Sequence, residues 1–353
     1  MTEQIIPDYL SYATENHASD IFIIAGRPLS VKIDGKMSIF GERLMPDDTD
    51  RLIHQIYSMA GNRNIDPFLQ KGDDDFSFSI PGLSRFRVNA YRQRGSLAAV
   101  IRVIAFDLPN PDILHIPEEV MSAADFTKGM VLVTGPAGSG KSTTMACIVD
   151  RINHSREGHI ITLEDPLEYL HRHDKCIVSQ REICTDTESY LVSLRATLRQ
   201  SPDVILLGEM RDYETIQTAM TAAETGHLVL SSLHTTGAAN TIGRIVDVFE
   251  PSQQRQVSIQ LSMVLQAVIS QQLVPDINGH NIPVFEVMRL NPAIRNMIRD
   301  NKVHQIDGVI SSSAHEGMRA MDQSLLELYK QGRITRETAL KYASNGDMLK
   351  RKL

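Results

Sequence analysis

Hydrophobic and polar positions alternate in two different ways along the chain. In residues 1–105, apolar residues recur at helical spacing over 5–16 and alternate with polar ones in several short runs. These runs predict strands at 19–24, 31–39, 75–80, 85–91 and 98–103, and a further helix is predicted over 49–60, capped by Asp47 or Asp48. The pair Asp34-Gly35 predicts a hairpin turn. Mixed helices and antiparallel strands predict a compact α+β domain over residues 1–105.

Residues 106–118 are predicted to form a linker. Pro109, Pro111 and Pro117 fall in this stretch. Proline lacks a backbone donor and disfavours helix at the preceding residue, so regular structure is not expected here. We therefore place a second domain over residues 119–353.

In the second domain, short apolar runs alternate with helical patterns. Strands are predicted at 131–134, 159–163, 177–179, 204–207, 228–232 and 284–288, and helices at 141–153, 189–200, 213–224 and 238–247. This alternation is typical of an α/β fold with a parallel sheet and crossover helices. From about residue 290 the pattern predicts helices only, ending with 322–331 and 335–343.

Charge and cysteine content argue against several classes of protein. The chain has 353 residues with 36 Lys or Arg and 43 Asp or Glu, a formal charge of 36 − 43 = −7, which argues against nucleic acid as the main partner. Cys147, Cys176 and Cys184 form no C-x-x-C pair, so neither a disulfide framework nor a zinc site is expected. Residues 1–20 have no basic segment followed by an apolar one, and the sequence has no long apolar run, so neither a leader peptide nor a membrane span is expected. We expect a cytoplasmic protein, without direct membrane insertion, that meets a membrane only through a partner.

A glycine-rich loop follows the predicted strand 131–134 and opens the next helix. It consists of Gly135, Pro136, Ala137, Gly138, Ser139, Gly140, Lys141, Ser142 and Thr143, which match the pattern G-x-x-x-x-G-K-[ST]. Its glycines let backbone N–H groups surround phosphate oxygens at a helix N-terminus. Lys141 is expected to reach the β- and γ-phosphates and Ser142 to hold Mg²⁺. The sequence therefore predicts a nucleoside triphosphate site.

Two acidic clusters follow the loop, each at the end of an apolar strand. The first contains Glu164, Asp165 and Glu168, and a carboxylate there can orient or deprotonate an attacking water. The second contains Gly208 and Glu209. Gly208 stands where many such strands carry a metal-linked aspartate, so Glu209 is the remaining acid for Mg²⁺. A solvated acidic turn is the simpler alternative for the first cluster.

Histidines and arginines supply further candidates. His227 and His234 flank the predicted strand 228–232, where a histidine can sense a γ-phosphate; a purely structural role is the alternative. Arg85 and Arg87 share one face of a predicted strand. They form either a solvated basic face or a trans-acting pair that reaches a neighbouring subunit's nucleotide.

Together these motifs resemble the secretion ATPases of the type II/type IV pilus group, and within that group the pilus retraction ATPases. The resemblance covers nearly the whole chain: residues 135–143 match the Walker A motif, 161–168 the aspartate box, 208–212 the Walker B motif and 221–236 the histidine box. Ala137 departs from the threonine usual in this family, at a position that contributes mainly backbone. The tetracysteine zinc element typical of extension and secretion motors is absent from the sequence.

A short segment resembles the AIRNLIRE element of retraction motors. It comprises Ala293, Ile294, Arg295, Asn296, Met297, Ile298, Arg299 and Asp300, with Met297 and Asp300 as conservative departures. Ile294 and Ile298 lie one helical turn apart, and we expect their replacement to abolish retraction while sparing hydrolysis. Plain core packing is the alternative for this pair, and it would instead appear as lost stability.

The resemblance implies an α/β architecture with a PAS-like N-terminal domain, a RecA-like ATPase domain and a C-terminal helical region. It implies a homohexamer that binds ATP and Mg²⁺, with Glu168 as catalytic glutamate, Glu209 as Walker B acid, and Arg85 and Arg87 contributing to the neighbour's site. Hydrolysis would rotate the two domains and turn the inner-membrane pilus platform protein, to which the ATPase is docked.

Three other functions stay open on the sequence. An accessory retraction ATPase or a type II/IV secretion ATPase is the nearest; the absent cysteine tetrad and the 293–300 element argue against it. A RecA-like DNA motor is disfavoured by the acidic charge. A non-hydrolysing nucleotide-regulated adaptor is disfavoured because Glu168 and Glu209 are both present.

Overall fold

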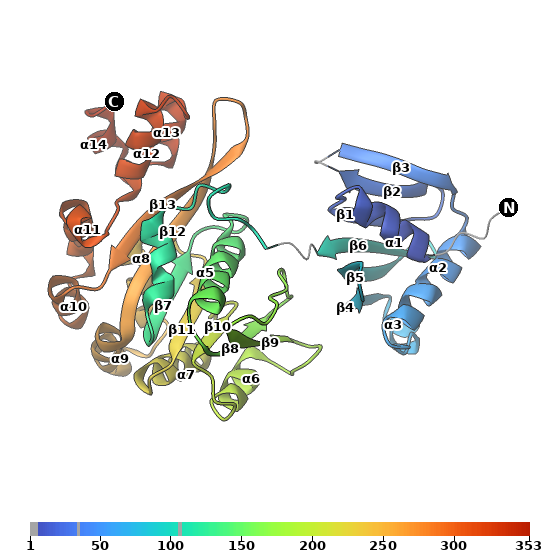
Figure 1. The fold of residues 1–353 in the computed structure, drawn as a ribbon, viewed down its shortest axis with the longest axis horizontal. Coiled ribbons are helices and arrows are strands. Elements are labelled where there is room, and N and C mark those ends of the chain that lie inside the picture. The colour runs from blue at the N-terminus through green and yellow to red at the C-terminus, as the bar shows by residue number, and fades with distance from the viewer. Residues whose placement is uncertain (1–5, 34–35, 105–107) are drawn as a thin grey trace. The chain divides into compact units, whose positions relative to one another are not determined.

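The computed structural model describes residues 6–33, 36–104 and 108–353 (Figure 1). The chain separates into two compact units, Met1–Asp107 and Leu108–Leu353. Each unit has its own sheet and its own hydrophobic core.

The first unit contains three helices and six strands among its described residues. They are α1 (Ile6–Glu15), β1 (Asp20–Ile23), β2 (Pro28–Ile33), β3 (Lys36–Arg43), α2 (Pro46–Met59), α3 (Asp66–Lys71), β4 (Asp73–Ile80), β5 (Ser84–Gln93) and β6 (Ser96–Ile104). The strands form an antiparallel sheet in the order β3-β2-β1-β6-β5-β4.

Alternation along the strands of this sheet separates a buried face from a polar one. On β5, Phe86, Val88 and Ala90 are fully buried against the helices, whereas the residues between them are partly or fully exposed. The helices contribute apolar side chains such as Leu10 and Ile53 to the same core. The period-2 pattern in the sequence therefore reports which face of the sheet the helices cover.

The first unit differs from its prediction in three details. Helix α2 begins at Pro46, three residues before the predicted start, and the Asp48 carboxylate accepts a hydrogen bond from the Met45 N–H at 2.8 Å. Helix α3 was not predicted, because it is only six residues long and has a single buried side chain, Phe68. The predicted turn at Asp34-Gly35 lies outside the described residues, although β2 and β3 pair as a hairpin requires.

The second unit alternates strands and helices and then continues in helices. Its first part contains α4 (Glu118–Met121), η1 (Ser122–Asp125), β7 (Gly129–Thr134), α5 (Lys141–Ser155), β8 (Gly158–Glu164), β9 (Cys176–Glu182), α6 (Tyr190–Thr197), β10 (Val204–Leu207), α7 (Tyr213–Glu224), β11 (Leu228–Leu233), α8 (Ala238–Asp247) and α9 (Pro251–Val264). Its second part contains β12 (Leu265–Pro275), β13 (Asn281–Arg289), α10 (Pro292–Arg299), η2 (Val303–Gln305), α11 (Ile306–Ser312), η3 (Ala314–Glu316), α12 (Met321–Lys330), α13 (Arg336–Tyr342) and α14 (Gly346–Lys350).

The second unit is a three-layer sandwich around a seven-stranded sheet of order β13-β12-β7-β11-β10-β8-β9. Helices α6 to α9 cover one face, where Leu132 and Val229 belong to the core. Helices α4 and α5 cover the other face, where Val131 and Leu230 lie. Strands buried on both faces read as continuous apolar runs, which is why β7 and β10 were easily predicted.

Strand β12 was missed, and its neighbour β13 was placed in a parallel sheet. The structure shows that β12 pairs parallel with β7, but β13 runs antiparallel to β12. Glutamines at 266, 271 and 272 interrupt the apolar run of β12, and the strand begins directly after α9 with no intervening loop. Neither feature gives the usual boundary signal of a strand.

The C-terminal helices confirm the prediction of a helical region after about residue 290. Helices α12 to α14 pack on the distal part of the β12–β13 hairpin, where Val274 and Val284 are buried with Leu325. In the described part of the chain, no helix is both long and apolar enough to cross a bilayer.

Helix α10 corrects the expectation for Ile294 and Ile298. These side chains are 0% and 1% exposed and belong to the core on the α6–α9 face of the sheet. The exposed positions of the element are Ala293, Arg295, Asn296, Arg299 and Asp300. Core packing, the alternative named above, therefore describes the two isoleucines, and a partner can only meet the other face of this helix.

We predict that Ile294→Ala lowers the free energy of unfolding by about 2–5 kcal/mol, because it removes a buried side chain and leaves a cavity. Arg295→Ala, one residue away on the exposed face, is the matched control and is expected to change stability by about 0.5 kcal/mol or less. Urea unfolding followed by circular dichroism measures both. Equal stability of the two variants would contradict the burial of Ile294.

Candidate nucleotide-binding site

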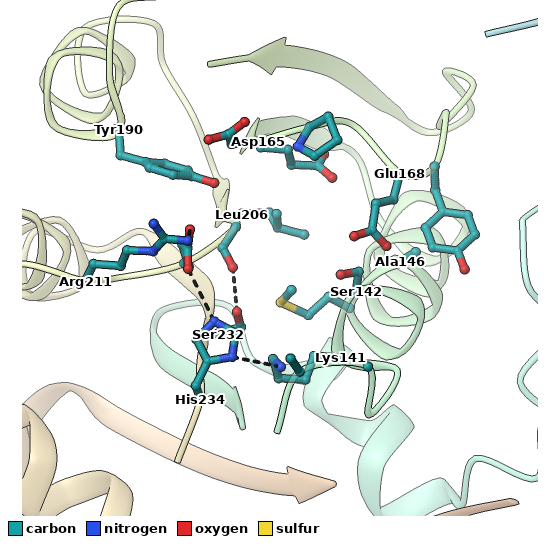
Figure 2. A pocket seen from close by; sticks show the side chains of 18 of the residues that line it. Lys141, Ser142, Ala146, Asp165, Glu168, Tyr190, Leu206, Arg211, Ser232 and His234 are labelled. Carbon is teal, nitrogen blue, oxygen red and sulfur yellow. Dashed lines mark hydrogen bonds and ion pairs between the residues drawn. The ribbon is translucent and has the colours of Figure 1, made fainter. Parts of the chain in front are cut away.

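Parallel pairing brings four strand ends to one edge of the sheet. Strand β11 pairs with β7 up to Leu233 and Thr134, and β10 pairs with both β11 and β8 up to Leu207. The loops that follow these strands surround a cavity of about 280 Å³ (Figure 2). Ligands of open α/β sheets bind outside the carboxyl ends of the strands, so this cavity is the expected ligand site.

The glycine-rich loop forms one wall of the cavity. Gly140 has φ +86°, a left-handed conformation that favours glycine, and it precedes the first residue of α5. The Lys141 ammonium donates hydrogen bonds to the carbonyl oxygens of Gly135 and Pro136, each at 3.0 Å. Burial lowers the pKa of Lys141, whereas the carboxylates of Glu168 and Glu209 act in the opposite direction. The loop therefore presents a partly desolvated cation at a helix N-terminus, an arrangement that suits phosphate.

His234 connects Lys141 with the second acidic cluster. Its Nδ1 lies 3.4 Å from the Lys141 Nζ, and its Nε2 lies 3.4 Å from a Glu209 carboxylate oxygen (Figure 2). Because the ammonium can only donate, Nδ1 is the acceptor in its contact with Lys141, and Nε2 faces the Glu209 carboxylate. The other Glu209 oxygen pairs with Arg211 at 2.7 Å. Four charged or polar side chains thus meet beside the loop.

The first acidic cluster faces the cavity from β8 and the turn after it. Glu168 points into the cavity beside Ser142 (Figure 2), and Glu164 and Asp165 also line it. Burial raises the pKa of Glu164 to about 7, and the nearby Glu168 charge adds to the increase. Gln180 donates a long hydrogen bond of 3.5 Å to Glu164. Three glutamates therefore line the cavity, and one of them, Glu164, has a pKa near neutrality and can exchange protons under working conditions.

The presence of glycine at position 208 is explained by the Tyr190 side chain, which packs against it. A Cβ at position 208 would lie 2.8 Å from the Tyr190 hydroxyl oxygen and 3.3 Å from the Leu163 carbonyl oxygen. An aspartate therefore does not fit at this place without movement of Tyr190. Burial, and then the charge of Glu209, raise the pKa of Tyr190. The acid of this strand end is accordingly Glu209, as predicted from the residue order.

The structure does not bring every predicted residue to the cavity. His227 precedes β11 and lies at the opposite end of that strand from His234, where its Nδ1 is 2.9 Å from the Ala222 carbonyl oxygen. Both histidines were predicted to be functional because they flank one strand; of the two, His234 lines the cavity and His227 does not. Thr143 is not among the residues that line the cavity, although its hydroxyl lies 2.8 Å from that of Tyr169, which does line it.

Arg85 and Arg87 belong to the first unit and lie on the polar face of its sheet. Arg87 forms a bidentate ion pair with Asp75, with distances of 2.6 and 3.1 Å. Arg85 reaches the Ser79 hydroxyl at 3.5 Å. Both arginines therefore have partners within their own sheet, and a role in another subunit's site stays a prediction.

The donor set of the cavity fits Mg²⁺. Ser142 and Glu209 supply a hydroxyl and a carboxylate, the hard oxygen ligands that Mg²⁺ prefers together with substrate phosphates and water. In the described parts of the chain, no group of three or more His, Cys, Asp or Glu is arranged to hold a metal by itself. A metal here would therefore depend on the nucleotide for most of its ligands.

Comparison with known proteins agrees with this geometry. The family model "Type II/IV secretion system protein" matches residues 1–316. The chain belongs to this family. It is 42% identical over 335 residues to the type IV pilus retraction ATPase PilT of Pseudomonas aeruginosa, covering 95% of this chain and 96% of that protein. It is 38% identical to the type IV pilus ATPase PilU of the same organism, covering 97% and 89%.

A solved structure of a relative shares the whole fold. The crystal structure of the pilus retraction motor PilT with bound ADP superposes with a TM-score of 0.91 at 45% identity, covering 99% of this chain and 100% of that one. The predicted family, the ATPase class and the fold class are therefore confirmed, including the antiparallel N-terminal unit, the parallel-sheet unit and the C-terminal helices.

Several cavity residues of this family member were not predicted. Tyr169, His171, Tyr190 and Arg211 all line the cavity. Tyr169 and His171 follow the first acidic cluster and Arg211 lies in the 208–212 segment, so proximity to these motifs was their sequence signal, whereas Tyr190 had none. Burial lowers the pKa of His171 to about 4, so this ring is neutral in the cavity wall.

We predict that Glu164→Gln changes the pH dependence of stability. The carboxyl has an ordinary pKa of 4.5 and a folded pKa of about 7. Between these values the unfolded chain releases a proton that the folded chain retains, so the wild type loses stability relative to the glutamine variant as the pH rises. The loss is on the order of 1–3 kcal/mol and is complete above pH 7.

Urea unfolding of both proteins at pH 5.0 and pH 7.5 tests this expectation. The difference in the free energy of unfolding between wild type and variant should shift in favour of the variant at the higher pH. The same difference at both pH values would contradict the desolvated state of Glu164.

Proposed function

We propose that this chain is the Mg²⁺-dependent ATPase that drives type IV pilus retraction and thereby twitching motility. One observation carries the proposal: Lys141, Glu168, Glu209 and His234 converge on a single cavity at the carboxyl edge of a parallel sheet. Similarity to PilT over nearly the full length of both chains supports the retraction role. We place the protein in the cytoplasm, docked at the inner face of the membrane through the pilus machine.

In this proposal ATP lies with its phosphates over the glycine-rich loop. Backbone N–H groups of the loop and the Lys141 ammonium bind the β- and γ-phosphates, since the loop and Lys141 both line the cavity. Ser142 and Glu209 would hold Mg²⁺, which neutralises charge on these phosphates when bound. His234, held between Lys141 and Glu209, is placed to respond to the γ-phosphate.

Hydrolysis requires a water directed at the γ-phosphorus. Glu168 orients this water and accepts its proton, because its carboxylate points into the cavity beside Ser142. The bond from the γ-phosphorus to the bridging oxygen breaks as the bond to the water oxygen forms, leaving ADP and inorganic phosphate. Glu164, whose pKa is about 7, is a second group able to take up the released proton.

We further propose a homohexamer in which neighbouring subunits complete each site. Arg85 would leave Ser79 and Arg87 would leave Asp75 to reach the nucleotide of the next subunit. Rotation of the two units of each chain during hydrolysis would then turn the inner-membrane platform protein of the pilus. A monomer with full activity in light scattering and turnover assays would contradict this part of the proposal.

An accessory retraction ATPase is the second candidate function. The 38% identity to PilU over 97% of this chain favours it as the alternative. Introducing this gene alone into a bacterium that lacks its own retraction ATPases separates the two functions. Restored twitching supports the main proposal, and twitching that also requires a second ATPase supports the accessory role.

We predict that Lys141→Ala keeps the fold but lowers ATP turnover by about 100-fold or more, because a cation that stabilises the transferred phosphate is lost. Lys128→Ala, at an exposed position before β7, is the control and is expected to hydrolyse ATP like the wild type. Phosphate release and circular dichroism measure turnover and fold. Wild-type turnover by Lys141→Ala would contradict the proposed nucleotide site.

We predict that Arg295→Ala separates hydrolysis from movement. Arg295 is exposed on α10, so its replacement leaves the core and the distant cavity intact while it alters the surface proposed to meet the platform. ATP turnover should stay within about two-fold of the wild type, and twitching should be lost if, as we propose, the exposed face of α10 meets the platform. Arg336→Ala, an exposed arginine on α13, is the control for general surface charge. Full twitching by Arg295→Ala would exclude a role for Arg295 in contact with the platform.

A further inference from the structure

Gln271 lies on β12, the strand that borders β7, and its side chain and backbone both meet the glycine-rich loop. The residue is 3% exposed. Its Oε1 accepts a hydrogen bond of 2.7 Å from the hydroxyl of Thr144, which is fully buried in the first turn of α5. One side chain thus connects β12 with the helix that begins at Lys141.

The loop also approaches Gln271 at its two ends. A Cβ at Gly135 would lie 2.1 Å from the Gln271 carbonyl oxygen, and a Cβ at Gly140 would lie 2.9 Å from its Nε2. A side chain at position 135 would clash with backbone, and one at position 140 would displace the Gln271 amide, so both glycines allow this close packing and adopt positive φ angles of 144° and 86°. Strand β12 therefore packs directly against the glycine-rich loop.

We propose that Gln271 is a positioning residue for the phosphate loop. It contacts the loop from behind and is not among the residues that line the nucleotide cavity, so it acts through the loop and not on the substrate. By holding Thr144 and the two glycines, it sets the direction of the loop N–H groups and of the Lys141 ammonium. The inference depends on ATP hydrolysis at this site, as proposed above.

The amide group of Gln271 is suited to this position. It accepts from Thr144 and keeps a neutral NH₂ group close to Gly140. Glutamate would place a buried negative charge behind a loop that binds phosphate, and methionine would leave the Thr144 hydroxyl buried without its partner. Gln271→Met keeps nearly the same volume and removes only the polar function.

The neighbouring Gln272 provides a matched control. Successive residues of a strand point to opposite sides, and the Gln272 Nε2 donates to the Tyr342 carbonyl oxygen at 3.4 Å, away from the loop. Gln272→Met therefore removes a polar contact from the same strand without touching the loop.

The test compares ATP hydrolysis by full-length Gln271→Met and Gln272→Met. We expect kcat to fall by about 10- to 100-fold in Gln271→Met, because small displacements of positioned groups have effects of this size. The KM for ATP should change less than kcat, and the thermal midpoint should stay near that of Gln272→Met, which should hydrolyse ATP like the wild type. Wild-type kcat and KM in folded Gln271→Met would overturn the proposal.

Variants of Thr144 test the same bond from the other side. Thr144→Val should reproduce the kinetic defect, Thr144→Ser should restore activity, and Gln271→Met with Thr144→Val should be no worse than either change alone. Additive defects, or equal activity of the valine and serine variants, would overturn the role of this bond. If the wild type itself does not hydrolyse ATP, the proposed function fails, and that result differs from every outcome for the variants.

Discussion

The parallel pairing of β7, β11, β10 and β8 is the constraint on which the site depends. Backbone hydrogen bonds hold these strands in a register that ends at Thr134, Leu233 and Leu207, so the loops that follow them start at the same edge of the sheet. The strands are apolar and buried on both faces, and polar chemistry is therefore confined to their ends. A shift in this register would separate the glycine-rich loop from the carboxylates.

The polar groups at this edge stabilise one another through direct contacts between protein side chains. His234 joins the Lys141 ammonium to Glu209, and Arg211 balances the same carboxylate. Such charged groups are costly to bury unless they are paired. The network thus keeps two cations and the Glu209 carboxylate close together at a partly desolvated cavity that Glu168 also lines, an arrangement that suits phosphoryl transfer.

Much of this could be predicted from local sequence, and the failures have physical reasons. Lys141, Glu168 and Glu209 were placed correctly because each follows a buried strand, and that pattern fixes the edge of the sheet. Strand β12 was missed because polar residues normally indicate exposure, whereas some of its polar residues are buried. Gln271, for example, is buried against the glycine-rich loop. His227 was misplaced because it precedes β11 and so lies at the amino end of that strand, away from the carboxyl edge where ligands bind. Tyr190 depends on long-range packing against Gly208, which no local pattern reports.

The most direct test is ATP hydrolysis by the purified wild-type protein, measured as phosphate release with Mg²⁺ and again after the metal is removed with EDTA. We predict saturable turnover that disappears with the metal and returns when Mg²⁺ is restored. Folded, assembled protein that neither binds nor hydrolyses ATP in the presence of Mg²⁺ would contradict the central claim that the loop and the carboxylates form one catalytic site.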